Sequence, residues 1–283
     1  MLRTATALRT LERRDRGVVL ALCARDPVAS VMLAERVERA GSEPARVGGE
    51  IWGFFEQGEL RSACWAGANL VPVGAASPAA RDAFASRAGR TSRPYSSLFG
   101  PAEAVLGLWA RLEAGGWRAR QVRARQLLYA IDRPSPVPAD PHVQRASLDD
   151  IDVVLPASVA MFTEEVGYSP VSGDQGASYR RRVAELLREG RTFVRRAADG
   201  SVVFKADLGS VSTAVAQVHG VWVDPRFRGR GLAAPAMAAV VTGALRDIAP
   251  TVSLYVNDYN APAVAAYQRV GFTQVGTFAT VLL

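Results

Sequence analysis

Residues 221–232 combine groups that could bind an anion. A β-branched stretch turns into Arg226-x-x-Gly229-x-Gly231, and an Ala-rich segment predicted as a helix over 231–248 follows. The first N–H groups of a helix have no acceptor within it and lie at the positive end of its dipole, and glycines let the backbone approach a phosphate closely. The pattern predicts a pyrophosphate site, although a plain strand-to-helix turn is an equal alternative for these glycines taken alone.

A second motif follows one further predicted strand, 252–256, and contains a predicted helix over 261–270. It reads Asn260-x-x-Ala263-x-x-x-Tyr267-x-x-x-Gly271-Phe272. Together, with one helix and one strand between them, the two motifs resemble the signature of the GNAT N-acetyltransferase superfamily over 143–283.

The resemblance implies that acetyl-CoA is the cosubstrate. Its pantetheine arm would lie along the strand 215–223, where this strand splays from 252–256, and its pyrophosphate would meet the glycine loop. The binding residues that the resemblance implies are Val221, Trp222, Val223, Arg228, Gly229, Arg230, Gly231, Leu232, Ala233, Ala234 and Asn260. For the two valines, simple core packing is the alternative, and both roles can hold at once.

Acetyl transfer to an amine requires a deprotonated nucleophile, a polarised thioester carbonyl and a proton for the leaving thiolate. Tyr267 matches the tyrosine that many superfamily members place near the CoA sulfur. The resemblance therefore implies that Tyr267 gives the thiolate its proton or hydrogen bond. A helical tyrosine packed in the core, with its hydroxyl satisfied, is the alternative.

His219 lies on the strand before the loop, where some superfamily members carry a histidine general base. A reference pKa of about 6.5 allows a histidine to accept a proton at neutral pH. A hydrogen-bonded structural histidine is an equal alternative. Strand alternation puts His219 on the face of Val221 and Val223 unless a bulge intervenes. Glu164 and Glu165, near the end of a predicted helix, are weaker candidates, because solvated carboxylates commonly end helices.

The composition is that of a globular protein of 283 residues, 49% hydrophobic and 22% charged, with room for two domains. The net charge of +7 comes from dispersed arginines, and Lys205 is the single lysine among 34 basic residues, so no basic block indicates nucleic acid. Cys23 and Cys64 are too few for a disulfide framework, and with His142 and His219 they give no metal-ligand spacing. The sequence contains no run that could span a membrane and no secretory segment. We expect a cytoplasmic protein with reduced thiols and with no metal, membrane or nucleic-acid partner.

The elements that would position these residues occur in the same order twice. The first set comprises helical stretches over 17–40, strands 51–55, 60–66 and 70–73, helix 79–88, strand 96–99, helix 101–114 and strand 126–131. The second comprises strand 143–146, helices 148–166 and 177–188, strands 192–195, 202–206 and 215–223, helix 231–248, strand 252–256, helix 261–270 and an extended stretch 273–283. Four prolines within 132–141 separate the two sets, because they can continue neither a helix nor an interior strand.

We therefore expect an α/β fold with a mixed α+β sheet, in two tandem GNAT-like domains. The expected limits are an N-terminal domain over 1–133, a Pro-rich linker over 134–141 and a catalytic domain over 142–283. The stretch 69–78 of the first half lacks the Arg-x-x-Gly-x-Gly pattern. The chain thus resembles the tandem GNAT proteins of actinobacteria, in which one half keeps the cofactor site and the other is a degenerate copy.

The expected function is acetyl-CoA-dependent transfer of an acetyl group to a primary amine by direct attack on the thioester. The amine would belong to a protein lysine, a protein N-terminus or a small molecule, and the sequence does not discriminate among them. The alternative is a non-catalytic acyl-CoA-binding sensor. Tyr267 favours catalysis, and a Tyr267 far from the sulfur site would favour the sensor.

Overall fold

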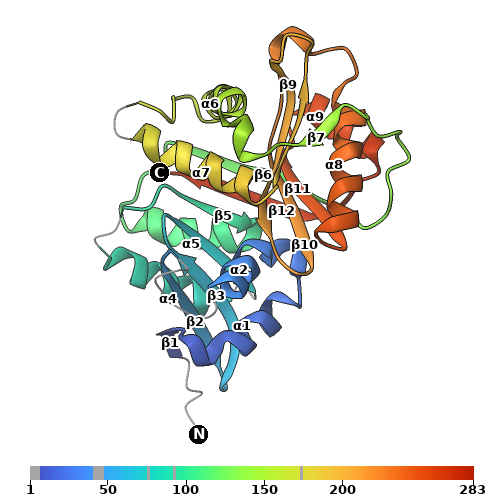
Figure 1. The fold of residues 1–283 in the computed structure, drawn as a ribbon. Coiled ribbons are helices and arrows are strands. Elements are labelled where there is room, and N and C mark those ends of the chain that lie inside the picture. The colour runs from blue at the N-terminus through green and yellow to red at the C-terminus, as the bar shows by residue number, and fades with distance from the viewer. Residues whose placement is uncertain (1–6, 41–47, 75–76, 92–93, 173–174) are drawn as a thin grey trace, which may run out of the picture. The chain divides into compact units, whose positions relative to one another are not determined.

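The computed structural model describes residues 7–40, 48–74, 77–91, 94–172 and 175–283. Within them one order of elements appears twice: strand, 3-10 turn, two helices, three strands, helix, strand, helix and strand (Figure 1), with one additional 3-10 turn, η3, before the third helix of the second half. This repetition confirms the expected mixed α/β fold in two tandem halves.

The elements of the first half are β1 (Ala7–Thr10), η1 (Arg13–Asp15), α1 (Arg16–Cys23), α2 (Pro27–Arg39), β2 (Glu50–Glu56), β3 (Glu59–Ala66), β4 (Asn69–Gly74), α4 (Pro78–Gly89), β5 (Ser97–Pro101), α5 (Ala102–Ala114) and β6 (Gln121–Ile131). Those of the second half are β7 (Val143–Arg145), η2 (Leu148–Asp150), α6 (Ile151–Val166), α7 (Gln175–Arg188), β8 (Thr192–Arg196), β9 (Val202–Val211), β10 (Val215–Val223), η3 (Pro225–Phe227), α8 (Ala233–Asp247), β11 (Thr251–Asn257), α9 (Ala261–Val270) and β12 (Thr273–Leu282).

The chain folds into two compact units. Unit 1 comprises the described residues up to Leu128 together with Tyr255–Tyr259 and Gln274–Leu283, and unit 2 comprises Tyr129–Leu254 and Asn260–Thr273. Most of the last strand of the second half, β12, thus belongs to unit 1, where it pairs antiparallel with β5. The domain limits expected near 133 and 142 follow the repeat in the sequence, whereas the units follow the pairing of strands.

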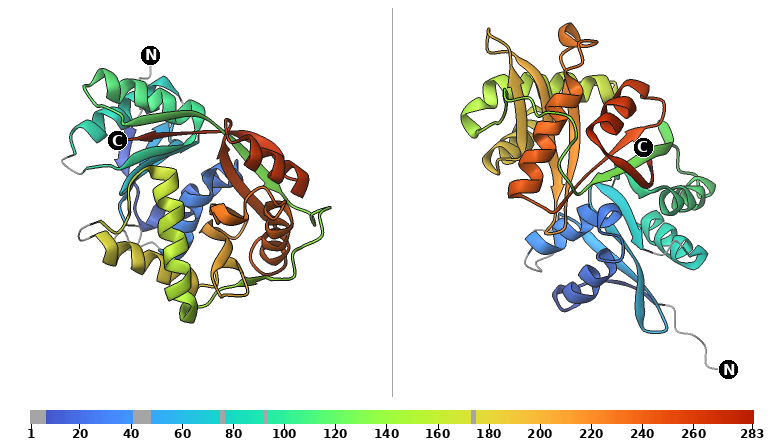
Figure 2. Two further views of the ribbon diagram at one scale, coloured as in Figure 1. Left: turned by 90° about the horizontal axis from the view of Figure 1, so that it is seen from above. Right: turned by 90° about the vertical axis from the view of Figure 1, so that its right-hand side faces the viewer.

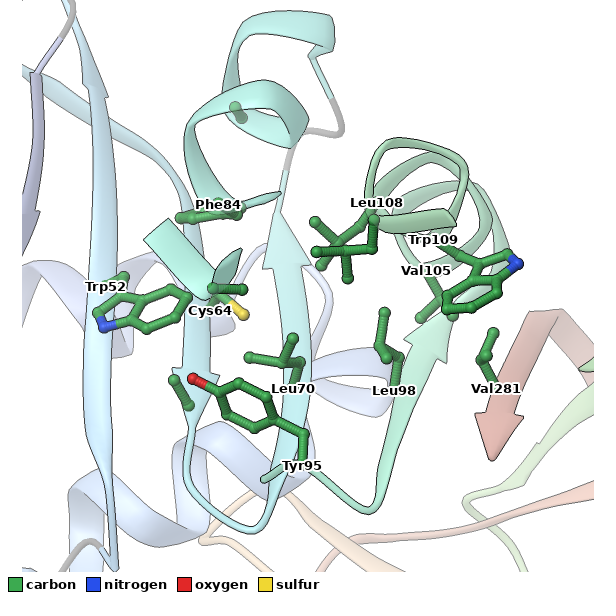
Figure 3. Packing of buried hydrophobic residues seen from close by; sticks show 14 of the residues in the cluster. Trp52, Cys64, Leu70, Phe84, Tyr95, Leu98, Val105, Leu108, Trp109 and Val281 are labelled. Carbon is green, nitrogen blue, oxygen red and sulfur yellow. The ribbon is translucent and has the colours of Figure 1, made fainter. Parts of the chain in front are cut away.

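Unit 1 contains a sheet in the order β1-β2-β3-β4-β5-β12. Side chains of α1 and α2, such as Leu22 and Leu33, pack on one face in a core with Trp65. Side chains of α4 and α5 pack on the other face, where Figure 3 shows Phe84 and Trp109 among the buried residues. The first half is therefore a two-faced sheet with an apolar core on each side.

Unit 2 contains strands in the order β11-β10-β9-β8-β7. Helices α6 and α7 cover one face, where Val154 and Val183 pack in a cluster with Trp222 of β10. Helix α8 covers the opposite face, where its Gly243 lies against the ring of Phe193 in β8. The views in Figure 2 agree with this layering, with strands β9 and β10 between α8 and the pair α6 and α7.

Local sequence signals explain the ends of the helices near the motifs. Asn260 caps α9 by accepting a hydrogen bond from the Ala263 N–H at 3.3 Å, and Gly271 ends the helix at a φ of +103°. Helix α6 ends at Gly167, which has a φ of +86°. Within the described part of the chain, none of the helices combines the length and apolarity that crossing a bilayer requires.

Three strands differ clearly from the sequence prediction, and one of them, β6, begins at Gln121, five residues before the predicted start at 126. Strand β1 was not predicted, and it pairs antiparallel with β2 at the edge of the sheet. Strand β9 continues to Val211, five residues beyond the predicted end at 206, because Leu208 and Ser210 pair with β10. Strand β1 and the end of β9 show no clear alternation of apolar and polar positions, so a periodicity argument does not detect them.

Candidate functional site

Strand β10 is the backbone of the candidate site. Its pairs with β11 are parallel and run from Val215↔Thr251 to Val218↔Leu254 among the described residues, while its pairs with β9 continue to Val223↔Phe204. The second half of β10 thus extends beyond the paired stretch of β11.

A β-bulge interrupts β10 at Gly220. His219 pairs with Asp207 and Trp222 pairs with Lys205, so two residues of β10 oppose one residue of β9. Gly220 has a φ of +56°, a conformation that favours glycine. Because the bulge shifts the alternation, His219 and Trp222 lie on the face that α6 and α7 cover. Val223 pairs with Phe204 and lies on the opposite face, so the bulge resolves the question of parity that the sequence left open.

The peptide groups of β10 alternate between its two edges. The Asp224 N–H donates to the Val203 carbonyl, so the groups of Asp224 and Trp222 point toward β9. Those of Val221 and Val223 point to the other edge. The Val223 carbonyl there accepts a hydrogen bond at 2.9 Å from Nε of Arg228.

The glycine loop leads from this edge to the N-terminus of α8. Gly229 and Gly231 both have a φ of +74°, and among the described residues no atom lies within 4 Å of a Cβ built on either. The first helical bond is donated by the Ala236 N–H to the Leu232 carbonyl, so the helical pattern gives the N–H groups of Ala233 and Ala234 no acceptor. Left-handed glycines before the first N–H groups of a helix are an arrangement that can bind an anion.

The three arginines around the loop differ in how far they are neutralised. Arg226 donates from Nη2 to Oδ2 of Asp224 at 2.7 Å, and Arg228 donates to both oxygens of Glu164 at 2.8 and 2.7 Å. Arg230 has no carboxylate partner among the described residues, and its guanidinium lies 5.3 Å from the ring centroid of Phe227. Two of the three arginines therefore form ion pairs within the protein, and Arg230 does not among the described residues.

Glu164 connects α6 to the loop, a role that the sequence reasoning did not assign to it. Its Oε2 accepts a hydrogen bond from Nε1 of Trp222 at 3.3 Å in addition to the bond from Arg228. The hydrogen bonds from Arg228 lower the pKa of Glu164, against a smaller opposing effect of burial. Glu164 is therefore a carboxylate at neutral pH. The ring of Trp222 is buried in the apolar cluster that includes Val154 of α6, while its Nε1 donates to Glu164.

Tyr267 lies on α9, buried except for 7% of its surface, with its ring edge-to-face against Phe272 at 6.1 Å between centroids. Burial, and to a smaller extent the carboxylate of Glu165, raises the pKa of its hydroxyl. The group is therefore protonated throughout the physiological range and can donate a hydrogen bond. Asn260 caps the same helix with its side chain.

His219 is held in a polar layer under α6 and α7. Its Nε2 lies 2.8 Å from Oε1 of Gln217, and Nδ1 lies against Gly209. Burial, followed by the charge of Arg182, lowers the pKa of His219 to about 4, and Asp207 partly opposes this. His219 is thus a neutral imidazole at neutral pH.

Lys205, which the sequence analysis noted only as the single lysine, forms a buried ion pair with Asp207 on β9. Asp207 also accepts a hydrogen bond from the Thr192 hydroxyl at 2.8 Å. A lysine inside an apolar strand, two residues before an aspartate, was the signal in the sequence that could have indicated this pair.

The corresponding region of the first half is built differently. Gly74 ends β4 with a φ of +85°, but a Cβ there would lie 2.6 Å from the Arg61 carbonyl, so this turn is packed. Ser77 caps α4 by accepting from the Ala80 N–H at 3.2 Å. Residues 75–76 of the stretch predicted to lack the cofactor pattern lie outside the described residues.

The described residues also contain no group of three or more His, Cys, Asp and Glu side chains that could hold a metal ion.

Residues 160–272 match the model of the acetyltransferase (GNAT) family, and residues 49–154 match a domain of unknown function, DUF4081. No curated protein matches the chain.

Several solved structures have the same fold over nearly the whole length of both chains. A GCN5-related N-acetyltransferase from Sphaerobacter thermophilus is 16% identical with a TM-score of 0.57, covering 99% of this chain and 96% of its own. An acetyltransferase of the GNAT family from Colwellia psychrerythraea is 13% identical with a TM-score of 0.55, covering 98% and 99%. A tandem GNAT protein from the clavulanic acid biosynthesis pathway is 16% identical with a TM-score of 0.54, covering 98% of each chain. At these identities the likeness concerns the fold alone.

Proposed function

Because residues 160–272 form a domain of the GNAT acetyltransferase family, we propose that this protein is an acetyl-CoA-dependent N-acetyltransferase. The acceptor is a primary amine on a protein lysine, a protein N-terminus or a small molecule, and a cytoplasmic location belongs to the proposal. The observation that carries the proposal is the open glycine loop at the N-terminus of α8.

The loop fits the pyrophosphate of CoA. The space in front of Gly229 and Gly231 is free of described atoms, and a side chain on either residue would fill it. The N–H groups of the loop and of Leu232, Ala233 and Ala234 would bind the phosphate oxygens, with Arg230 as the free cation. Arg228 would join it on release from Glu164.

The outward edge of β10 fits the pantetheine arm. The arm carries amide groups, and the backbone groups of Val221 and Val223 point away from β9, so that they can pair with it as with a neighbouring strand. Trp222 contributes indirectly, through its bond to Glu164. Asn260 would act at the start of α9, where its carboxamide already caps the helix.

Acetyl-CoA supplies an acetyl group activated as a thioester, and the protein supplies orientation and proton transfer. The N–H of Val221 would polarise the carbonyl, and the protonated hydroxyl of Tyr267 would stabilise the leaving sulfur by donating a hydrogen bond. His219 is the candidate general base for the proton of the amine, directly or through water. Its lowered pKa limits it to passing that proton onward rather than holding it.

The test combines calorimetry with thiol release. We expect acetyl-CoA to bind the purified protein, and a panel of peptides and small amines to include an acceptor that releases free CoA. Binding without release for every acceptor would instead indicate the acyl-CoA sensor. Failure to bind acetyl-CoA would contradict both functions.

A further inference from the structure

Lys205 is the single lysine of the chain and is fully buried on β9. Its Nζ pairs with Oδ2 of Asp207, and the other oxygen of Asp207 accepts the Thr192 hydroxyl at 2.8 Å. Two buried charges in a strand cost desolvation free energy, which apolar side chains of similar size would not. Stability alone therefore does not account for the buried ion pair, and its contacts indicate another role.

The pair lies directly beneath the bulge of β10. Asp207 pairs with His219 and Lys205 pairs with Trp222, so the two charged residues face the two ends of the bulge. A Cβ built on Gly220 would lie 3.4 Å from Oδ2 of Asp207, 3.6 Å from Nζ of Lys205 and 2.9 Å from Cε of Met161. The ion pair and Met161 thus enclose the single residue whose left-handed backbone makes the bulge.

The bulge decides which way the cofactor edge of β10 points. Shifting the register of a strand by one residue turns every side chain and peptide group to the other side. With the bulge, Val221 and Val223 present their N–H and C=O groups away from β9, where Arg228 already reaches the Val223 carbonyl. Without it, the residues beyond position 220 would change sides.

We propose that the buried Lys205–Asp207 pair is a positioning element for the cofactor: it fixes the bulge at Gly220 and thereby directs the backbone of Val221 and Val223 toward the pantetheine arm. This inference rests on the proposed function. It assigns neither residue a direct contact with acetyl-CoA.

The single lysine makes the first test direct. In protein labelled with 15N-lysine, Lys205 gives the one side-chain ammonium signal, which burial protects from exchange with water. We expect acetyl-CoA to shift this signal, because the arm would bind the strand above it. Adenosine 3′,5′-bisphosphate, which carries phosphates but no arm, should leave it nearly unmoved. An unmoved signal in protein that calorimetry shows to be saturated with acetyl-CoA would overturn the inference.

The second test removes both charges at once. The double variant Lys205→Met, Asp207→Leu replaces the pair with apolar groups, an exchange that often preserves stability in other proteins. We expect it to fold but to bind acetyl-CoA about tenfold more weakly or worse, because the edge of β10 loses its orientation. The matched control is Arg145→Met, Asp247→Leu, which removes the 2.8 Å pair between β7 and α8 and should leave binding unchanged.

The outcomes separate the two proposals. If the wild type binds acetyl-CoA and the double variant binds it equally well, the positioning role is overturned and the proposed function stands. A wild-type protein that does not bind acetyl-CoA would refute the proposed function itself. If the double variant does not fold, the lysine signal of the wild-type protein decides.

Discussion

Glu164 and Arg228 form a two-point ion pair, with hydrogen bonds of 2.8 and 2.7 Å, that ties the end of α6 to the loop before α8. Both side chains are substantially exposed, at 51% and 43%, so water screens the pair and its contribution to stability is small. The pair matters because Glu164 would compete with a bound phosphate for Arg228. While Glu164 holds Arg228, that guanidinium is not available to a phosphate.

The first prediction concerns this competition. Glu164→Gln should tighten acetyl-CoA binding by about threefold, because it removes a negative charge beside the loop and releases Arg228. Calorimetry at low and at high salt would measure it, with a smaller gain expected at high salt because ions screen the exposed charges.

The control for this variant is a double-mutant cycle. In an Arg228→Gln background, Glu164→Gln should change affinity less, since the cation that it releases is gone. Equal gains in the two backgrounds would show that Glu164 acts by simple repulsion of the ligand and not by holding Arg228.

The second prediction concerns the shape of the loop. Gly231→Ala should weaken acetyl-CoA binding by about tenfold, because the methyl group enters the space that a phosphate would occupy. The left-handed backbone should also cost about 1–2 kcal/mol of unfolding free energy. Calorimetry and urea denaturation measure the two effects.

Gly190 provides a matched control for Gly231. It follows α7 with a φ of +64°, and a Cβ there also meets no described atom within 4 Å. Gly190→Ala should therefore lose similar stability and keep full binding. A loss of binding in both variants would mean that destabilisation, rather than the loop, explains the effect.

Much of the fold follows from local signals that the sequence displays. Asn260 followed by Pro262 marks the start of α9, and Gly271 marks its end, because capping and left-handed termination depend on residues only a few positions apart. The glycine loop was likewise recognisable, since its conformation depends on Gly229 and Gly231 themselves. Such features need no knowledge of tertiary structure.

The features that the sequence reasoning missed depend on residues that are distant in the chain. Glu164 and Arg228 are 64 positions apart, and only the packing of α6 beside β10 brings them together. The bulge at Gly220 likewise depends on the register of β10 against β9, and a single glycine in a strand does not reveal the direction of the shift. Without that register, the sequence could not determine on which face of the sheet the side chain of His219 lies.

The third prediction concerns pH. Burial holds the pKa of His219 in the folded protein at about 4, against 6.5 for the model value. Below pH 6.5 the unfolded chain binds a proton that the folded protein refuses, so stability is lost as the pH falls toward 4 and is unaffected above 7. By linkage, the loss attributable to this group should be about 2 kcal/mol at pH 5.

Urea denaturation of the wild type and of His219→Gln at pH 7 and pH 5 measures this effect. Between pH 7 and pH 5, the free energy of unfolding of His219→Gln should fall by about 2 kcal/mol less than that of the wild type, because glutamine has no group to protonate. Carboxylates contribute to both proteins and cancel in the comparison. Equal losses would show that His219 titrates normally, which would restore it as an ordinary general base.

The fourth prediction concerns Tyr267. Its protonated hydroxyl, kept so by burial and by Glu165, is proposed to donate a hydrogen bond to the departing sulfur. Removing it should slow acetyl transfer without affecting the ground-state complex, because the bond strengthens only as negative charge develops on the sulfur. Tyr267→Phe should therefore lower kcat by about 10²-fold, with the Kd for acetyl-CoA unchanged.

Tyr129→Phe is the control for Tyr267→Phe, since the hydroxyl of Tyr129 on β6 accepts a 3.3 Å bond from Gln268, the neighbour of Tyr267 on α9. It should leave kcat unchanged, which would separate loss of the proton donor from a general disturbance of α9. A further distinction comes from the acyl donor: a thioester with a more acidic leaving thiol needs less help, so it should restore part of the rate of Tyr267→Phe. If Tyr267→Phe slows acetyl transfer equally with both acyl donors, Tyr267 acts through the packing of α9, and another group donates the proton to the thiolate.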